Sequence, residues 1–147
     1  PPRWVKILTA IARDEISHLG TVVRILEARG GSMARVHKNQ YATDLRSLVR
    51  LGRGKDELID RLMISSLIEL RSCERFSLLR DAAEDQELKK LYSALWSSEH
   101  GHYKVFLECA VKISNEDEAN ERFEEFLKEE AKIIAAQEIG PKMHGWV

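Results

Sequence analysis

Apolar residues recur at three- and four-residue steps along four long stretches of the chain. This spacing places them on one face of a helix and predicts amphipathic α-helices. The apolar periodicity is weaker between residues 30 and 55, where we expect a connection with one short helix over Asp44–Leu51 that buries Leu45, Leu48 and Val49. The four long stretches cover about residues 3–28, 55–83, 85–113 and 115–139.

Residues that favour helix ends stand at the limits of these stretches. Pro1-Pro2 suits the start of the first helix and Gly30-Gly31 suits its end. Ser114 or Asn115 can cap the last helix, and Gly140-Pro141 can stop it. The pattern therefore predicts an all-α protein.

A carboxylate and an imidazole interrupt the apolar stripe of the third long helix. Glu99 and His102 are three residues apart and continue the stripe that runs from Leu95 to Phe106. Burying such groups costs free energy unless each has a partner. His100 lies off this face, and Gly101 suggests close packing because glycine weakens a helix by about 1 kcal/mol against alanine.

The same Glu-x-x-His spacing occurs on the first helix, where Glu15 and His18 continue its apolar stripe. A single histidine on such a stripe is most simply a hydrogen-bonded core residue. Two pairs on two core faces favour metal ligation.

A third candidate ligand, Glu69, falls in the middle of the stripe of the second long helix. A buried carboxylate there must be protonated, ion-paired or bound to metal. Glu74 belongs to a neighbouring face beside Arg71, where a salt bridge is expected. Glu130 lies on the stripe of the last helix and could be another buried acid, but most of that helix is charged, so we expect it at the edge of a bundle.

These residues match a four-helix carboxylate centre. Such proteins bind two metal ions with one Glu from each of two helices and a Glu-x-x-His from each of the other two. Glu15, His18, Glu69, Glu99 and His102 follow that order, and imidazole and carboxylate together suit iron or manganese. One glutamate is lacking. We expect it on a preceding helix, since the chain starts without methionine. The alternative is a metal-free helical interaction module with buried ion pairs.

Composition places the chain among folded helical proteins. Of its 147 residues, 44% are hydrophobic and 32% charged, with a formal net charge of -1. We expect a single domain over residues 1–147. No apolar run is long enough to span a membrane. Cys73 and Cys109 are expected as buried thiols, which favours a cytoplasmic setting.

The connection between the first two long helices is locally basic. An ordinary solvated crossover explains this charge, and so does a surface that contacts nucleic-acid phosphates. The candidate contacts are Arg35, Lys38, Arg46, Arg50 and Arg53. His37 lies in the same segment.

Three runs resemble the tRNA hydroxylase family called MiaE: Asp14–His18, Ile68–Phe76 and Ser98–Tyr103. The resemblance covers most of the chain and is most specific at the Arg-Ser-Cys-Glu-Arg-Phe run. It implies a ferritin-like four-helix bundle with an additional C-terminal helix. We expect the first helix of that bundle to be missing from this chain. His100-Gly101 departs from the bulkier pair expected at that place.

The resemblance also implies an activity. The family uses two non-haem iron ions and dioxygen to hydroxylate the isopentenyl group of 2-methylthio-N6-isopentenyladenosine in tRNA. Glu15, His18, Glu69, Glu99 and His102 would then be both iron ligands and catalytic residues, tRNA would be the substrate, and an external electron donor would be required. A rubrerythrin- or ferritin-like peroxidase or ferroxidase is the alternative di-iron enzyme.

Overall fold

The described residues of the computed structural model, 2–36, 38–140 and 143–144, form helices and no strands, which confirms the all-α prediction. The chain divides into two compact units, Pro1–Lys38 and Asn39–Val147, which are described here separately. A single domain over the whole chain stays a prediction. The helices are α1 (Pro2–Ala28), α2 (Gln40–Ser47), α3 (Lys55–Ala82), α4 (Gln86–Ile113) and α5 (Glu116–Ala135).

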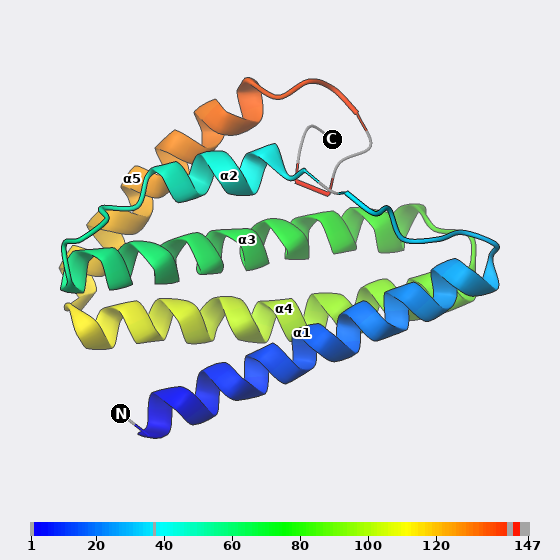
Figure 1. Ribbon diagram of the computed structural model, residues 1–147, viewed down its shortest axis with the longest axis horizontal. Coiled ribbons are helices and arrows are strands. Elements are labelled where there is room, and N and C mark those ends of the chain that lie inside the picture. Colours follow the sequence, from blue (N-terminus) through cyan, green and yellow to red (C-terminus); the bar gives the residue numbers. More distant parts are fainter. Residues whose placement is uncertain (1, 37, 141–142, 145–147) are drawn as a thin grey trace. The chain divides into compact units, whose positions relative to one another are not determined.

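The first unit consists of α1 and the segment that follows it (Figure 1). As predicted, two glycines end this helix. Gly30 adopts a φ of 78°, and the amide of Gly31 donates to the carbonyl of Leu26 at 2.9 Å. A Cβ on Gly31 would lie 2.4 Å from Cδ1 of Leu26, so a larger residue there would have to displace the Leu26 side chain.

The second unit is organised around α3 and α4, which lie side by side along their length (Figure 1). Both helices have the predicted bounds to within about two residues. The carboxylate of Asp85 accepts a hydrogen bond from the amide of Glu87 at 2.7 Å and so caps α4. The predicted stripes are buried at Leu62, Cys73, Leu95 and Phe106.

The short helix α2 begins and ends four residues earlier than the sequence predicted. Asn39 causes the earlier start, because its side chain accepts from the amide of Ala42 at 3.1 Å. Leu45 is fully buried as expected, whereas Leu48 and Val49 lie beyond the helix and are half-buried. The predicted range 44–51 was therefore wrong at both ends.

The last helix starts as predicted but ends early. Asn115 caps α5 by accepting from the amide of Glu118 at 2.9 Å. The helix ends at Ala135, followed by the C-cap Ala136, and so the predicted end near Ile139 was wrong. None of the described helices is long and apolar enough to cross a membrane.

Candidate metal centre

The packing of α3 against α4 brings together three of the predicted ligands. Glu69 comes from α3, and Glu99 and His102 come from α4. One ligand atom from each of these three side chains lies within 4.8 Å of the other two. Residues that are 30 or more positions apart in the sequence therefore share one site because the two helical stripes face each other.

The Glu99 and His102 pair is the buried part of this cluster. Helical spacing puts Oε2 of Glu99 3.3 Å from Nδ1 of His102. Glu99 is 4% exposed and His102 is 6% exposed, while Glu69 is half-buried. The apolar side chains of Leu95 and Phe106 continue the stripe on either side and are buried too. A carboxylate and an imidazole are thus held in a water-poor environment on a rigid helix.

Cys73 lies on α3 one turn after Glu69, and it is buried with its thiol free. Burial raises the pKa of this thiol to about 11, with further contributions from the Glu99 and Glu69 carboxylates. The thiol is therefore neutral near pH 7 and adds no negative charge to the cluster. Cys109 is buried and free as well, and both observations confirm the predicted thiols.

The first unit carries the other Glu-x-x-His pair on α1. Oε2 of Glu15 lies 3.8 Å from Nδ1 of His18. This pair has the same helical spacing as Glu99 and His102, so α1 presents a carboxylate and an imidazole on one face. Glu15 is exposed and His18 is half-buried, so the prediction that this pair lies on a buried core face was wrong.

The donor set of the second unit fits a metal ion. Two carboxylates and one imidazole within 4.8 Å of one another combine hard oxygen donors with a nitrogen donor, and that mixture suits intermediate divalent metals. A cation would also offset the negative charge that Glu69 and Glu99 bring to a poorly hydrated place. The cluster therefore has the chemistry of a metal centre.

The surroundings of His100 and Gly101 differ from the prediction of close packing. Gly101 is exposed, and a Cβ built on it would meet no atom within 4 Å. The glycine thus fills no tight contact, and that expectation was wrong. His100 lies on another face of α4 from the ligands, as predicted, with its ring stacked on Trp96 at a centroid distance of 4.9 Å.

A buried ion pair next to α3 was missed by sequence reasoning. Glu130 of α5 is 1% exposed rather than at a bundle edge. It accepts hydrogen bonds from Arg71 at 2.7 and 3.2 Å and from the Tyr41 hydroxyl at 2.5 Å. Burial, together with the Glu130 carboxylate, raises the pKa of Tyr41 well above its usual range, so the phenol keeps its proton and donates. Arg71 also pairs with the exposed Glu74, the salt bridge that the sequence predicted.

A second buried acid, Asp60, was also missed. It is fully buried on α3 and accepts from Arg50 at 2.8 and 2.9 Å and from Arg122 at 2.8 and 3.1 Å. Burial alone would raise the pKa of Asp60, but the hydrogen bonds from Arg50 and Arg122 outweigh it and hold this pKa below its usual value. Arg50 therefore has a structural role that its place in a basic loop did not reveal.

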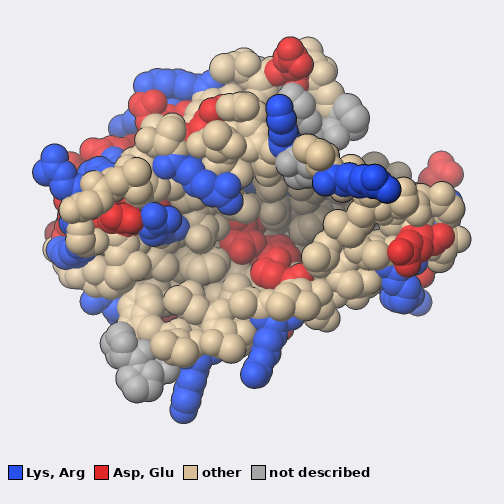
Figure 2. All heavy atoms as spheres, viewed as in Figure 1, with Lys and Arg blue, Asp and Glu red and all other residues tan. Residues whose placement is uncertain are grey.

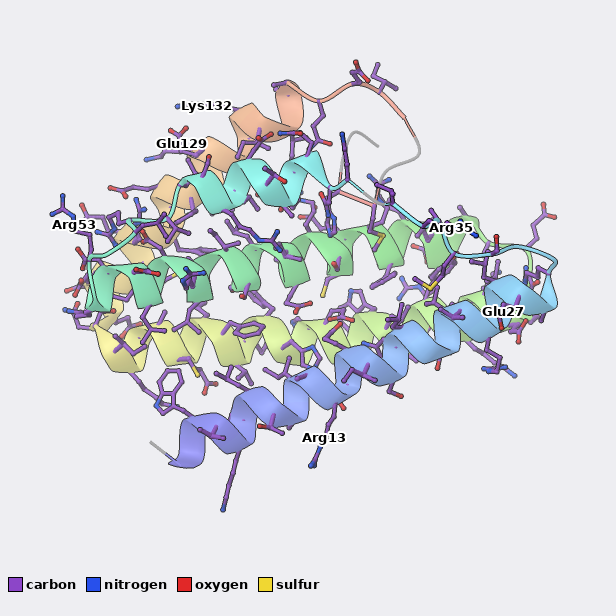
Figure 3. The ribbon with its side chains drawn as sticks, viewed as in Figure 1. Arg13, Glu27, Arg35, Arg53, Glu129 and Lys132 are labelled. Atoms are coloured by element: carbon purple, nitrogen blue, oxygen red, sulfur yellow. The ribbon has the colours of Figure 1, made fainter. Side chains whose placement is uncertain are left out.

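The other basic candidates are exposed. Arg46 and Arg53 belong to the second unit, and Arg35 and Lys38 belong to the first. Figure 3 shows the Arg53 side chain reaching outward from the turn before α3. Around α2 the surface seen in Figure 2 carries cationic and anionic side chains interspersed rather than one uniformly basic area. On α5, for example, Lys132 pairs with Glu129 at 2.6 Å (Figure 3).

The helical fold is ferritin-like, and its carboxylate and histidine cluster could hold a metal ion. Comparison with known proteins narrows this class. Residues 2–145 match the family model described as tRNA-(MS[2]IO[6]A)-hydroxylase (MiaE), and the chain belongs to this enzyme family.

Two relatives carry the name tRNA 2-(methylsulfanyl)-N(6)-isopentenyladenosine(37) hydroxylase. The one from Pseudomonas putida is 31% identical over 97% of this chain and 69% of its own length. The one from Salmonella typhimurium is 31% identical over 95% of this chain, which spans only about half (51%) of that relative.

Among solved structures, the chain is similar to a Synechococcus protein described as having aldehyde deformylating oxygenase activity. The TM-score is 0.82 at 28% sequence identity, and the match covers 94% of this chain and 70% of the other. This likeness confirms the ferritin-like fold.

Proposed function

We propose that the protein hydroxylates the isopentenyl group of 2-methylthio-N6-isopentenyladenosine in tRNA, using dioxygen and a centre of two non-haem iron ions. The observation that carries this proposal is the convergence of Glu69, Glu99 and His102 in a chain that matches a tRNA hydroxylase family over nearly its whole length. The names of the two relatives support the same substrate.

The proposed ligands come from both units. Glu69, Glu99 and His102 would hold metal on the α3 and α4 side, and Glu15 and His18 of α1 would supply a second carboxylate and imidazole pair. Two redox-active metal ions and dioxygen would provide the oxidising power for an unactivated C–H bond, which protein side chains cannot provide. An external electron donor would complete the reaction.

The protein's own residues would prepare the site for that chemistry. The buried stripe around Leu95 and Phe106 excludes water from the Glu99 side of the cluster. Packing of α4 fixes the imidazole of His102 against Glu99, so that little rearrangement is needed when a cation binds. In this proposal Glu99 and His102 act as metal ligands, and the reaction needs no separate general base.

Contacts with the tRNA backbone would come from the exposed basic residues. Arg35, Lys38, Arg46 and Arg53 have exposed side chains, as Arg50 does. Arg50 contributes least in this proposal, because its guanidinium is held by Asp60. The modified base would leave its stack to reach the metal centre. The proposed setting is the cytoplasm.

The direct test uses full-length protein loaded anaerobically with ferrous iron and given prenylated tRNA, a reductant and isotopically labelled dioxygen. Nucleosides from the digested tRNA are then examined by mass spectrometry. The proposal requires one labelled oxygen atom in the modified adenosine. A protein that oxidises ferrous iron or reduces peroxide but leaves this nucleoside unchanged would be a ferroxidase or peroxidase instead, and one that takes up no iron would be a metal-free module.

A matched pair of variants separates ligation from general damage to α4. Glu99→Gln removes the charge of a buried proposed ligand. Glu108→Gln makes the same change on the same helix at an exposed position, where Glu108 pairs with Lys112 at 3.5 Å. Label incorporation should be lost in the first variant and kept in the second. Equal activity in both would contradict the assignment of Glu99.

A further inference from the structure

Three aromatic rings follow one another along α4. The rings of Trp96 and His100 are stacked with centroids 4.9 Å apart and planes 26° from parallel. His100 and Tyr103 continue the row at 6.4 Å and 15°. Their spacing of four and three residues puts all three on one helix face. We call Trp96, His100 and Tyr103 the ring row.

The ring row flanks the ligand face. Trp96 lies three residues before Glu99 and Tyr103 lies four residues after it, so both border the ligand stripe, and His100 lies farther round the helix. The ligand pair is buried, whereas all three rings are half-exposed. The row is therefore a surface feature at the level of the metal centre, and the ligands do not account for it.

The neighbours of the ring row limit what can bind there. At one end, Tyr103 meets Phe123 of α5 at a centroid distance of 6.5 Å and a tilt of 44°, so α5 covers that end. Lys104 is exposed four residues after His100, which places a cation on the next turn of the helix. The surface thus offers flat rings and a positive charge side by side.

We propose that the ring row stacks an unpaired nucleobase of the tRNA substrate while Lys104 contacts a neighbouring phosphate. This inference rests on the proposed function. Aromatic rings beside cationic side chains are the usual means of holding single-stranded nucleic acid, because every base has a flat face and every nucleotide carries a negative charge. An unpaired base in the tRNA loop that carries the modified adenosine can reach such rings. A base inside a duplex is already stacked and cannot.

The test measures binding of the full-length protein to two RNA probes over a series of salt concentrations. The first is an anticodon stem-loop with an unpaired loop, and the second is a fully paired duplex of equal length. The variants are His100→Ala, Trp96→Ala, His100→Phe and Lys104→Ala. Tyr92→Ala is the matched control, because it removes a ring of α4 that stacks on Phe76 outside the row. Thermal unfolding is recorded for each protein.

The ring row predicts a selective loss. His100→Ala and Trp96→Ala should each weaken stem-loop binding by roughly 5- to 150-fold, the range expected for one lost stack of a base on an aromatic ring, and leave duplex binding unchanged. His100→Phe should restore stem-loop binding because it keeps a flat ring. Lys104→Ala should weaken the binding of both probes. It should also lower the slope of log affinity against log salt concentration by about one, the value for one lost phosphate contact.

Several results would overturn the inference. The first is a stem-loop affinity that stays at the wild-type value in folded His100→Ala and Trp96→Ala. The second is a loss of affinity in these variants that is equal for the stem-loop and the duplex. The third is the same loss of stem-loop affinity in Tyr92→Ala. If the wild-type protein hydroxylates prenylated tRNA in these cases, only the ring row is wrong. If the wild-type protein neither binds the stem-loop nor hydroxylates tRNA, the proposed function fails as well.

Discussion

The two Glu-x-x-His pairs have the same helical spacing but different settings. In the second unit, Glu99 and His102 are joined by Glu69 from a neighbouring helix, within a core shared by α3 and α4. In the first unit, Glu15 and His18 lie on α1, which is the only helix described there. The second unit therefore brings three candidate ligands together by itself, whereas the first carries one candidate pair on a single helix.

The two units therefore differ in which property a substitution should change, folding stability or metal content. The second unit contains the buried apolar stripes and the buried pairs of Glu130 with Arg71 and of Asp60 with Arg50. Substitutions there should affect folding. A complete two-metal centre in our proposal needs ligands from both units, so substitutions in either pair should affect metal content and activity.

The largest expected effect is on the stability of the second unit. Arg71→Ala leaves the Glu130 carboxylate buried without its cation, and this should lower the free energy of unfolding by about 3–5 kcal/mol. Chemical denaturation measures the change. Arg61→Ala is the control, because that arginine lies on the same helix in an exposed pair with Glu57 and should cost less than about 1 kcal/mol. Equal losses of unfolding free energy in the two variants would contradict a larger contribution from the buried pair.

The next effect compares the two imidazoles directly. His102→Ala and His18→Ala should each lower label incorporation into tRNA by at least about 100-fold, since even groups that only support metal ligands are worth 10- to 100-fold. Activity per folded protein is the measurement. Full activity in His18→Ala would remove α1 from the centre and leave the second unit to act alone.

A pH effect concerns His144, which stacks on Tyr41 with ring centroids 5.0 Å apart. Burial lowers the pKa of His144 to about 4 from an unfolded value near 6.5. The unfolded chain therefore binds one more proton between these values, and stability should fall as the pH drops from 6.5 to 4, by at most about 1.4 kcal/mol per pH unit. Denaturation at several pH values should show a shallower slope for His144→Phe, and an unchanged slope would contradict this origin.

The smallest effect tests the start of α5. Asn115→Ala removes the side chain that caps this helix and should cost about 1 kcal/mol in unfolding free energy. Asn115→Asp keeps an accepting oxygen and serves as the control. A loss as large as that of Arg71→Ala would mean that α5 depends on its cap more than on the Glu130 pair.

Local spacing was enough to predict the long helices and the buried face of α4, but not the setting of the α1 pair, in which Glu15 is exposed. The stripe through Leu95, Glu99, His102 and Phe106 is buried as its period indicates, because α4 has one face in the core. Glu69 meets that stripe because the stripes of two packed helices face each other.

The errors came from features that a local pattern does not contain. Glu130 is buried by a partner 59 residues away, and Arg50 is held by Asp60 across a turn. The early start of α2 depends on a cap at Asn39 that lies outside the apolar pattern. Gly101 has the helix cost that the sequence indicated but no close contact to explain it.

The most direct test of the two-unit centre is the iron content per chain of anaerobically loaded full-length protein, measured in the wild type and in the Glu15→Ala/His18→Ala double variant. We expect two iron ions in the wild type. The double variant should retain about one, held by Glu69, Glu99 and His102. Two iron ions in both proteins would contradict a role for α1, and none in the wild type would contradict the metal centre itself.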